Sequence, residues 1–159
     1  MPTANPRIII LLSVTILSGC LPSLSKKTPI SPDRTLITSR NLDRITGMQW
    51  TLKDMTVDGK EFKLTGEMPF VKLEKDGRIT GFASINRFFG SMTIDDKGEV
   101  KWPSSLGATR MAGPPALMTQ EDAFLKALVQ TGSVAIERIY LYMTSADNKT
   151  TLTFYVPVR

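Results

Sequence analysis

The chain has 159 residues, with 20 Lys and Arg against 15 Asp and Glu, so its formal charge is +5. It contains one cysteine and no histidine, which excludes an internal disulfide, a Ser-His triad and the histidine ligands of most zinc sites. The charged residues are scattered along the chain, so they indicate a soluble surface of mixed sign and no nucleic-acid partner. We therefore expect no catalytic residues, no metal and no cofactor.

The N-terminus has the features of an export signal. Residues 8–17 are ten uncharged residues that follow the basic Arg7. This length matches the apolar core of a secretory signal, about 7–15 residues, and falls short of the roughly 20 residues that span a bilayer. The next residues have the order of a lipobox, an aliphatic residue and two small ones before a cysteine: Leu17, Ser18, Gly19 and Cys20. We expect residues 1–19 to be a lipoprotein signal peptide, with lipidation at Cys20.

Residues 20–46 are predicted to form a lipidated, flexible tether. The segment contains three prolines and several serines and threonines, and it shows no apolar periodicity, which is typical of a linker. Leu21 stands where an aspartate would favour retention in the inner membrane. The expected location is therefore the bacterial cell envelope, at the outer membrane and facing the periplasm, with the membrane as a partner through the acylated Cys20.

Residues 47–159 are predicted to form one domain rich in strands. Apolar residues alternate with polar ones from 48 to 55, and Asp58-Gly59 then separates this run from residues 60–65, a strong signal for a β-hairpin. Further strands are expected at 70–74, 79–83, 91–94, 100–102, 133–144 and 150–156. The short turns between most of them exclude parallel crossovers, so the strands should form an antiparallel meander.

One helix interrupts the strands. Thr119 is the predicted N-cap, and the acidic and amide residues 120–122 would occupy the first turn, where they suit the helix dipole. The residues predicted to share its buried face are Phe124, Ala127 and Leu128, and Gly132 would end the helix. The predicted fold class is α+β: a curved antiparallel β-meander, or partial barrel, packed on one α-helix and preceded by a signal peptide and a flexible tether.

Two dense motifs flank the middle of the domain. The first comprises Asn86, Arg87, Phe88, Phe89 and Gly90, and the second comprises Thr109, Arg110 and Met111. In this order, and followed by the predicted helix, they resemble the META domain, also called the HslJ-like family, over about residues 47–156. The resemblance implies a small α+β domain with a strongly curved, barrel-like sheet. It also implies an exported or lipid-anchored envelope protein, since many family members are of this kind and some are linked to heat shock.

The chain departs from the family pattern at two positions. Many members carry cysteine where this chain has Ile85 and again where it has Gly113. If those cysteines pair in relatives, a bridge that contributes about 2–4 kcal/mol is missing here. A redox role at this place is therefore not expected.

The motif residues are interpreted as structural. Asn86 is expected to cap a strand end, while Phe88 and Phe89 would bury against the helix. Arg87 and Arg110 are the candidates for contact with a ligand. The favoured interpretation is that each of them has a structural role or is solvated. Two tryptophans, Trp50 and Trp102, are expected in the core or at the barrel mouth.

Two functions remain open at this stage. The first is a non-catalytic envelope module, stress-related in view of the resemblance, that binds a protein or another envelope component. The alternative is a carrier that holds a small apolar ligand in a barrel-like cavity. An interior filled with side chains would argue against the carrier.

Overall fold

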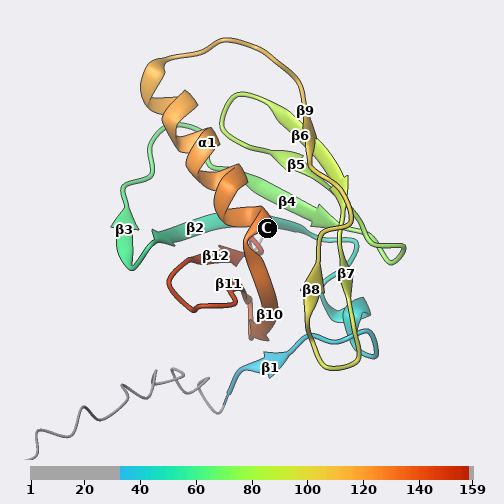
Figure 1. Cartoon of the computed structure of the whole chain (residues 1–159). Coiled ribbons are helices and arrows are strands. Elements are labelled where there is room, and N and C mark those ends of the chain that lie inside the picture. Colours follow the sequence, from blue (N-terminus) through green and yellow to red (C-terminus); the bar gives the residue numbers. More distant parts are fainter. Residues whose placement is uncertain (1–32, 158–159) are drawn as a thin grey trace, which may run out of the picture.

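A computed structural model describes residues 33–157 (Figure 1). The predicted signal peptide and lipobox, including Leu17, Ser18, Gly19 and Cys20, lie outside the described residues. So does most of the first half of the predicted tether.

The domain is built on one antiparallel sheet. Its strands are β1 (Thr35–Leu36), β2 (Gln49–Val57), β3 (Lys60–Phe62), β4 (Phe70–Leu73), β5 (Arg78–Phe82), β6 (Arg87–Ser91), β9 (Gly107–Ala108), β10 (Thr131–Glu137), β11 (Tyr140–Ser145) and β12 (Thr151–Tyr155). They lie in the order β1-β10-β11-β12-β2-β4-β5-β6-β9, with β3 paired to part of β2. The two ends of this order, β1 and β9, do not pair with each other, so the barrel is partial.

Two further elements complete the fold. The strands β7 (Thr93–Ile94) and β8 (Val100–Lys101) form a separate hairpin, and α1 (Pro115–Val129) packs across β2 and β12 (Figure 1). A short 3-10 helix (Leu42–Arg44) precedes β2. The predicted α+β class, a curved antiparallel sheet on one helix, is confirmed.

The hairpin between β2 and β3 has the predicted turn. Asp58 has φ 51° and Gly59 has φ 76°, and these two positive values are what a type I′ turn requires. Met55 then lies opposite Phe62 in the paired strands.

The helix begins earlier than predicted. Pro115 occupies its first turn, where the missing N–H of proline costs no hydrogen bond. Thr119 is therefore inside the helix, with its hydroxyl donating to the Pro115 carbonyl at 3.0 Å. The C-cap is Gln130, and Gly132 lies in β10. The predicted N-cap at Thr119 and stop at Gly132 are wrong.

The predicted strand 133–144 is two strands. β10 ends at Glu137 and β11 starts at Tyr140, and Arg138 between them has φ 55°. The turn was missed because neither Arg138 nor Ile139 is a residue that normally marks a turn with positive φ.

The predicted tether extends too far into the domain. β1 pairs with β10, and the side chains of Ile37 and Ile45 are fully buried. The Ile45 carbonyl also accepts a hydrogen bond of 2.8 Å from the indole N–H of Trp50. The part of the tether prediction that covers residues 35–45 is wrong, because these residues complete the core.

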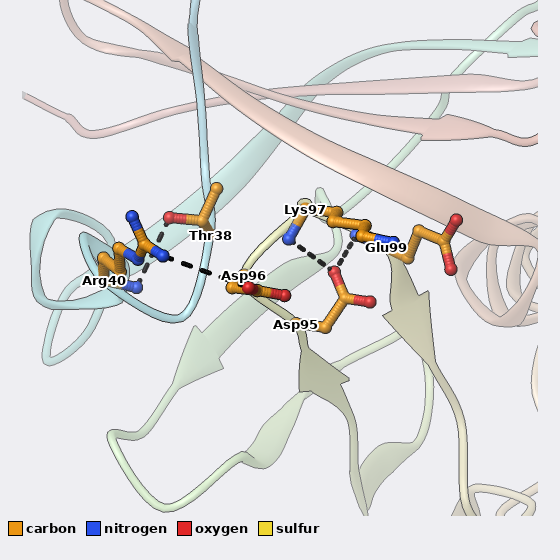
Figure 2. Close-up of polar contacts among 6 residues, drawn as sticks. All are labelled: Thr38, Arg40, Asp95, Asp96, Lys97 and Glu99. Atoms are coloured by element: carbon orange, nitrogen blue, oxygen red, sulfur yellow. Dashed lines mark hydrogen bonds and ion pairs between the residues drawn. The ribbon is translucent and has the colours of Figure 1, made fainter.

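The β7–β8 hairpin holds this N-terminal segment in place (Figure 2). The N–H of Ser39 donates to the Asp95 carbonyl at 3.0 Å, and Arg40 lies 3.9 Å from the Asp96 carboxylate. The Asp95 carboxylate closes the hairpin turn by accepting the N–H groups of Lys97 and Glu99 at 2.9 and 2.8 Å. These N–H groups lower the pKa of Asp95, that of Glu99 most strongly.

Aromatic side chains fill the interior between the sheet and α1. The ring of Phe124 on α1 lies 6.0 Å from Phe88 and 6.3 Å from Phe154, edge to face in both pairs. Trp50 is buried as predicted, and Trp102 is half-buried with its indole N–H donating to the Thr131 carbonyl at 3.2 Å. The predicted helix face of Phe124, Ala127 and Leu128 is buried as well.

Candidate functional site

The two family-like motifs meet at the side chain of Asn86. Its carbonyl oxygen accepts the N–H of Met111 at 2.7 Å and the hydroxyl of Thr109 at 2.8 Å. Its amide nitrogen donates to the Met111 carbonyl at 3.2 Å. Asn86 therefore fastens the start of β6 to the loop that leads into α1.

Glu121 on the helix completes this network. Its carboxylate accepts the N–H of Asn86 at 2.7 Å, the amide side chain of Asn86 at 2.7 Å, and the N–H of Ile85 at 3.2 Å. The neighbouring Gln120 is fully buried and donates to the Ser84 hydroxyl at 2.8 Å. Ser84 has φ 104°, so this side-chain contact supports a backbone conformation that is unfavourable for serine.

Sequence reasoning missed the roles of Gln120 and Glu121. It placed them in the first turn of the helix, but they lie four and three residues before Phe124 on its buried side. Their spacing from Phe124 was the signal, since residues three and four apart share a helix face. The interpretation of Glu121 as a helix-dipole residue is wrong.

The remaining motif residues are placed by the alternation of β6. Phe88 is buried, whereas Phe89 points to the other side, is 63% exposed and covers Gly107, because successive residues of a strand face opposite ways. The predicted burial of Phe89 is wrong. Gly90 is in close contact with the side chain of Leu106, which leaves no room for a Cβ atom at position 90. The arginines Arg87 and Arg110 and also Met111 are exposed at the surface.

A β-bulge shapes the outer face of the sheet. In the β2–β12 pair, Asp54 lies opposite Thr153 and Leu52 lies opposite Phe154, so Lys53 is an extra residue. Lys53 and Asp54 are both exposed, although they are consecutive. Such bulges re-aim a side chain and often occur beside functional sites.

The bulge brings a lysine to a pair of tyrosines. The Lys53 ammonium lies 3.1 Å from the Asp54 carboxylate and 5.3 Å from the centroid of the Tyr140 ring. The hydrogen bond and negative charge of Asp54 raise the pKa of Lys53, so Lys53 is charged over the physiological range. Tyr140 and Tyr155 are direct cross-strand partners on β11 and β12.

These residues border an open hollow of about 420 Å³. It is lined by Leu52, Lys53, Met68, Tyr140 and Tyr155, and we call it the tyrosine hollow. Lys53, Tyr140 and Tyr155 are outward residues of their strands, so the hollow lies on the outer face of the sheet. Its lining residues come from four segments of the chain, so no local sequence motif predicts the hollow.

A second cation lies on the same face. The Arg34 guanidinium is 3.6 Å from the centroid of the Tyr142 ring and 3.2 Å from the Glu137 carboxylate. Tyr142 is two residues after Tyr140 on β11 and points to the same side. Lys53 and Arg34 each thus lie between a tyrosine ring and a carboxylate.

Comparison with known families identifies the fold. The family model of the META domain matches residues 43–157. The chain belongs to the META domain family. The resemblance seen in the two motifs is confirmed. β1 lies before the matched range and pairs with β10 inside it.

Solved structures show the same META fold. An NMR structure of a protein from Burkholderia xenovorans has a TM-score of 0.59 and 22% identity, covering 87% of this chain and all of the other. A second NMR structure has a TM-score of 0.54 and 23% identity, covering 76% and 95% of the two chains. A crystal structure of a DUF4847 family protein from Bacteroides vulgatus has a TM-score of 0.53 and 14% identity, covering 74% and 97%. No curated protein matches the chain.

The two positions at which this META domain departs from the family pattern are in contact. A Cβ built on Gly113 would overlap Cδ1 of Ile85 and lie 2.9 Å from its Cγ1. Ile85 therefore fills the space that a side chain at position 113 would need.

Neither a membrane-spanning helix nor a metal-binding cluster occurs within the described residues 33–157. Within residues 33–157, no helix has both the length and the hydropathy of a membrane span. In the same part of the chain, no group of three or more acidic, cysteine or histidine side chains is placed to hold a metal ion.

Proposed function

We propose that this META domain protein is a lipid-anchored, non-catalytic protein of the bacterial cell envelope that binds a protein or another envelope component. The anchor would be the acylated Cys20, and the location would be the outer membrane, facing the periplasm. A stress-related role is part of the proposal because the family resemblance implies one.

The tyrosine hollow carries the binding half of this proposal. It places two aromatic rings, a charged lysine and the thioether of Met68 around one open space on the sheet. Aromatic and adaptable side chains around a few fixed polar groups are what binding sites generally offer. The motif network around Asn86 instead has its polar atoms occupied by hydrogen bonds within the domain.

The carrier hypothesis has no comparable support. It requires apolar space inside the sheet, and the interior of the described domain is packed with large side chains from both the sheet and α1. The largest fully buried ones include Trp50, Phe88, Phe124 and Phe154. The interior of this partial barrel is therefore a hydrophobic core, whereas a carrier would have a ligand cavity in the same place.

The anchor is tested with Cys20→Ala in the full-length chain. We expect this variant to lose labelling by radioactive fatty acid and to leave the membrane fraction, because the thiol that takes the lipid is gone. Ser23→Ala, three residues further along, is the matched control and should be labelled normally. Unchanged labelling and fractionation of Cys20→Ala would contradict the proposal.

Binding is tested by photo-crosslinking in intact cells. Benzoylphenylalanine in place of Tyr155 lies in the hollow, whereas the same probe in place of Lys97 lies at the β7–β8 turn. We expect a cross-linked product from position 155 and none from position 97. Equal products from both positions, or none from 155, would count against the hollow as the binding site.

A further inference from the structure

The outer face around the tyrosine hollow is unusually rich in hydroxyl groups. All six outward residues of β11 and β12 carry one: Tyr140, Tyr142, Thr144, Thr151, Thr153 and Tyr155. On the next strand, β2, Thr51 lies opposite Tyr155 and Thr56 lies opposite Thr151. Each of these side chains is half-buried, and together they form rows of hydroxyl-bearing residues that cross three strands.

Two ion pairs lie beside the hydroxyl-rich strands of this face. Lys53 lies 3.1 Å from the Asp54 carboxylate, and Arg34 lies 3.2 Å from the Glu137 carboxylate. Within these two pairs the charges cancel, so neither pair offers an unpaired charge to an anionic lipid surface, a nucleic acid or an acidic peptide. The exposed Lys72 on β4 lies further along the same face, over the Phe70 ring. Each pair does present a charged donor beside a charged acceptor, and such groups make the stronger hydrogen bonds.

None of the large exposed apolar residues of the described chain lines the hollow, although Ile139 directly precedes Tyr140. The large ones are Phe89, Met111, Met118, Val129 and Ile139, on β6, in the loop before α1, on α1 and at the β10–β11 turn. A protein partner usually buries apolar anchors at the centre of its interface. The middle of β11, β12 and β2 offers hydroxyls and tyrosine rings in their place.

A sugar ring matches this combination. Its C–H face is weakly apolar and stacks on an aromatic ring through dispersion, while each hydroxyl on its rim both donates and accepts a hydrogen bond. Neighbouring hydroxyls of one ring therefore need a donor and an acceptor side by side, as Lys53 and Asp54 supply. The hollow of about 420 Å³ also falls within the range of small-ligand sites, about 300–1,000 Å³.

We propose that the tyrosine hollow binds an uncharged sugar unit of an envelope glycan. One ring stacks against Tyr155, since the Lys53 ammonium already lies over the Tyr140 ring, and its hydroxyls hydrogen-bond to Lys53 and Asp54. Because the hollow is open on one side, the affinity for a short oligosaccharide is weak, with Kd on the order of 1 mM. The assignment rests on the proposed function, since it names the envelope component that the same site takes.

The test is an NMR titration of the processed chain, residues 20–159, carrying Cys20→Ala so that no lipid is attached. The probes are an N-acetylglucosamine tetramer and maltotetraose, both uncharged. We expect saturable amide shifts with at least one of them, centred on Lys53, Tyr140 and Tyr155. No shift at the hollow with either sugar up to 20 mM, or shifts confined to another face, would overturn the assignment.

The variants separate the hollow from its surroundings. Tyr155→Ala should weaken binding at least tenfold, and Tyr155→Phe should restore most of it because stacking needs the ring. Tyr142→Ala is the matched control, with the same residue type on the same face but outside the hollow, and should change Kd less than twofold. Dispersed amide spectra show that each variant is folded, and equal losses in Tyr142→Ala and Tyr155→Ala would refute stacking at the hollow.

Failure of the sugar assignment differs from failure of the proposed function. If position 155 cross-links to a protein in cells and neither sugar shifts the hollow, the glycan is ruled out while the binding module remains. If Cys20→Ala stays lipid-labelled and membrane-bound, the anchor is wrong whatever the sugars do.

Discussion

Glu121→Ala tests whether the motif network holds the domain together. The carboxylate of Glu121 accepts three hydrogen bonds, at 2.7, 2.7 and 3.2 Å, from residues about 35 positions earlier in the chain. A hydrogen bond to a charged group contributes about 1.5–3 kcal/mol, and a buried donor left unpaired costs about 1–3 kcal/mol. Since Glu121 is half-buried and water can replace part of the loss, we expect the free energy of unfolding to fall by about 2–4 kcal/mol.

The assay is reversible thermal and urea unfolding followed by circular dichroism. The expected loss corresponds to a Tm lower by about 10–15 °C for a domain of this size. Asp122→Ala is the matched control, because Asp122 is the next helix residue and is exposed, and it should change stability by less than about 0.5 kcal/mol. Glu121→Gln keeps the side-chain oxygen and should fall between the two. A Glu121→Ala protein as stable as the Asp122→Ala protein would refute the reasoning.

Three further predictions concern other parts of the domain. The double variant Ile85→Cys/Gly113→Cys should form a disulfide on oxidation and gain about 2–4 kcal/mol, because a Cβ built on Gly113 would lie 2.9 Å from Cγ1 of Ile85. Mass spectrometry, and unfolding with and without reductant, would show this. Ile37→Ala should cost about 2–5 kcal/mol in urea unfolding, since Ile37 is fully buried; a loss below 0.5 kcal/mol would mean that β1 is dispensable. The pKa of Asp95 is lowered from 3.8 by the N–H groups of its turn, so its contribution to stability is present above pH 4 and lost as the pH falls through the folded value. The Tm difference between the wild type and Asp95→Asn should therefore shrink from pH 5 to pH 2, and a difference that grows would contradict this sign.

Local signals in the sequence identified most elements of the fold. Asp58-Gly59 marked a hairpin because its φ values are fixed by the two residues themselves. Phe124, Ala127 and Leu128 marked the buried helix face because three- and four-residue spacing is a property of any α-helix. The two motifs around Asn86 and Thr109 were sufficient to recognise the family.

The sequence-based predictions that were wrong concern residues whose position depends on contacts with distant parts of the chain. Residues 35–45 look like a linker, yet they join the domain because β10 offers a free edge to β1 and the core has room for Ile37. Phe89 looks like a core residue, yet the register of β6 places it outside. Glu121 looks like a helix-dipole residue until the loop with Asn86 is folded against it.

The sequence by itself determined the class of elements, the family and the expected lipid anchor, because these depend on residues that are close together in the chain. Only the tertiary structure decided which outer surface carries the proposed site. The tyrosine hollow needs the pairing of Tyr140 with Tyr155 and a bulge that turns Lys53 outward. Strand register and bulges are set by the packing of the whole sheet, so residues separated by almost 90 positions meet there without any local trace in the sequence.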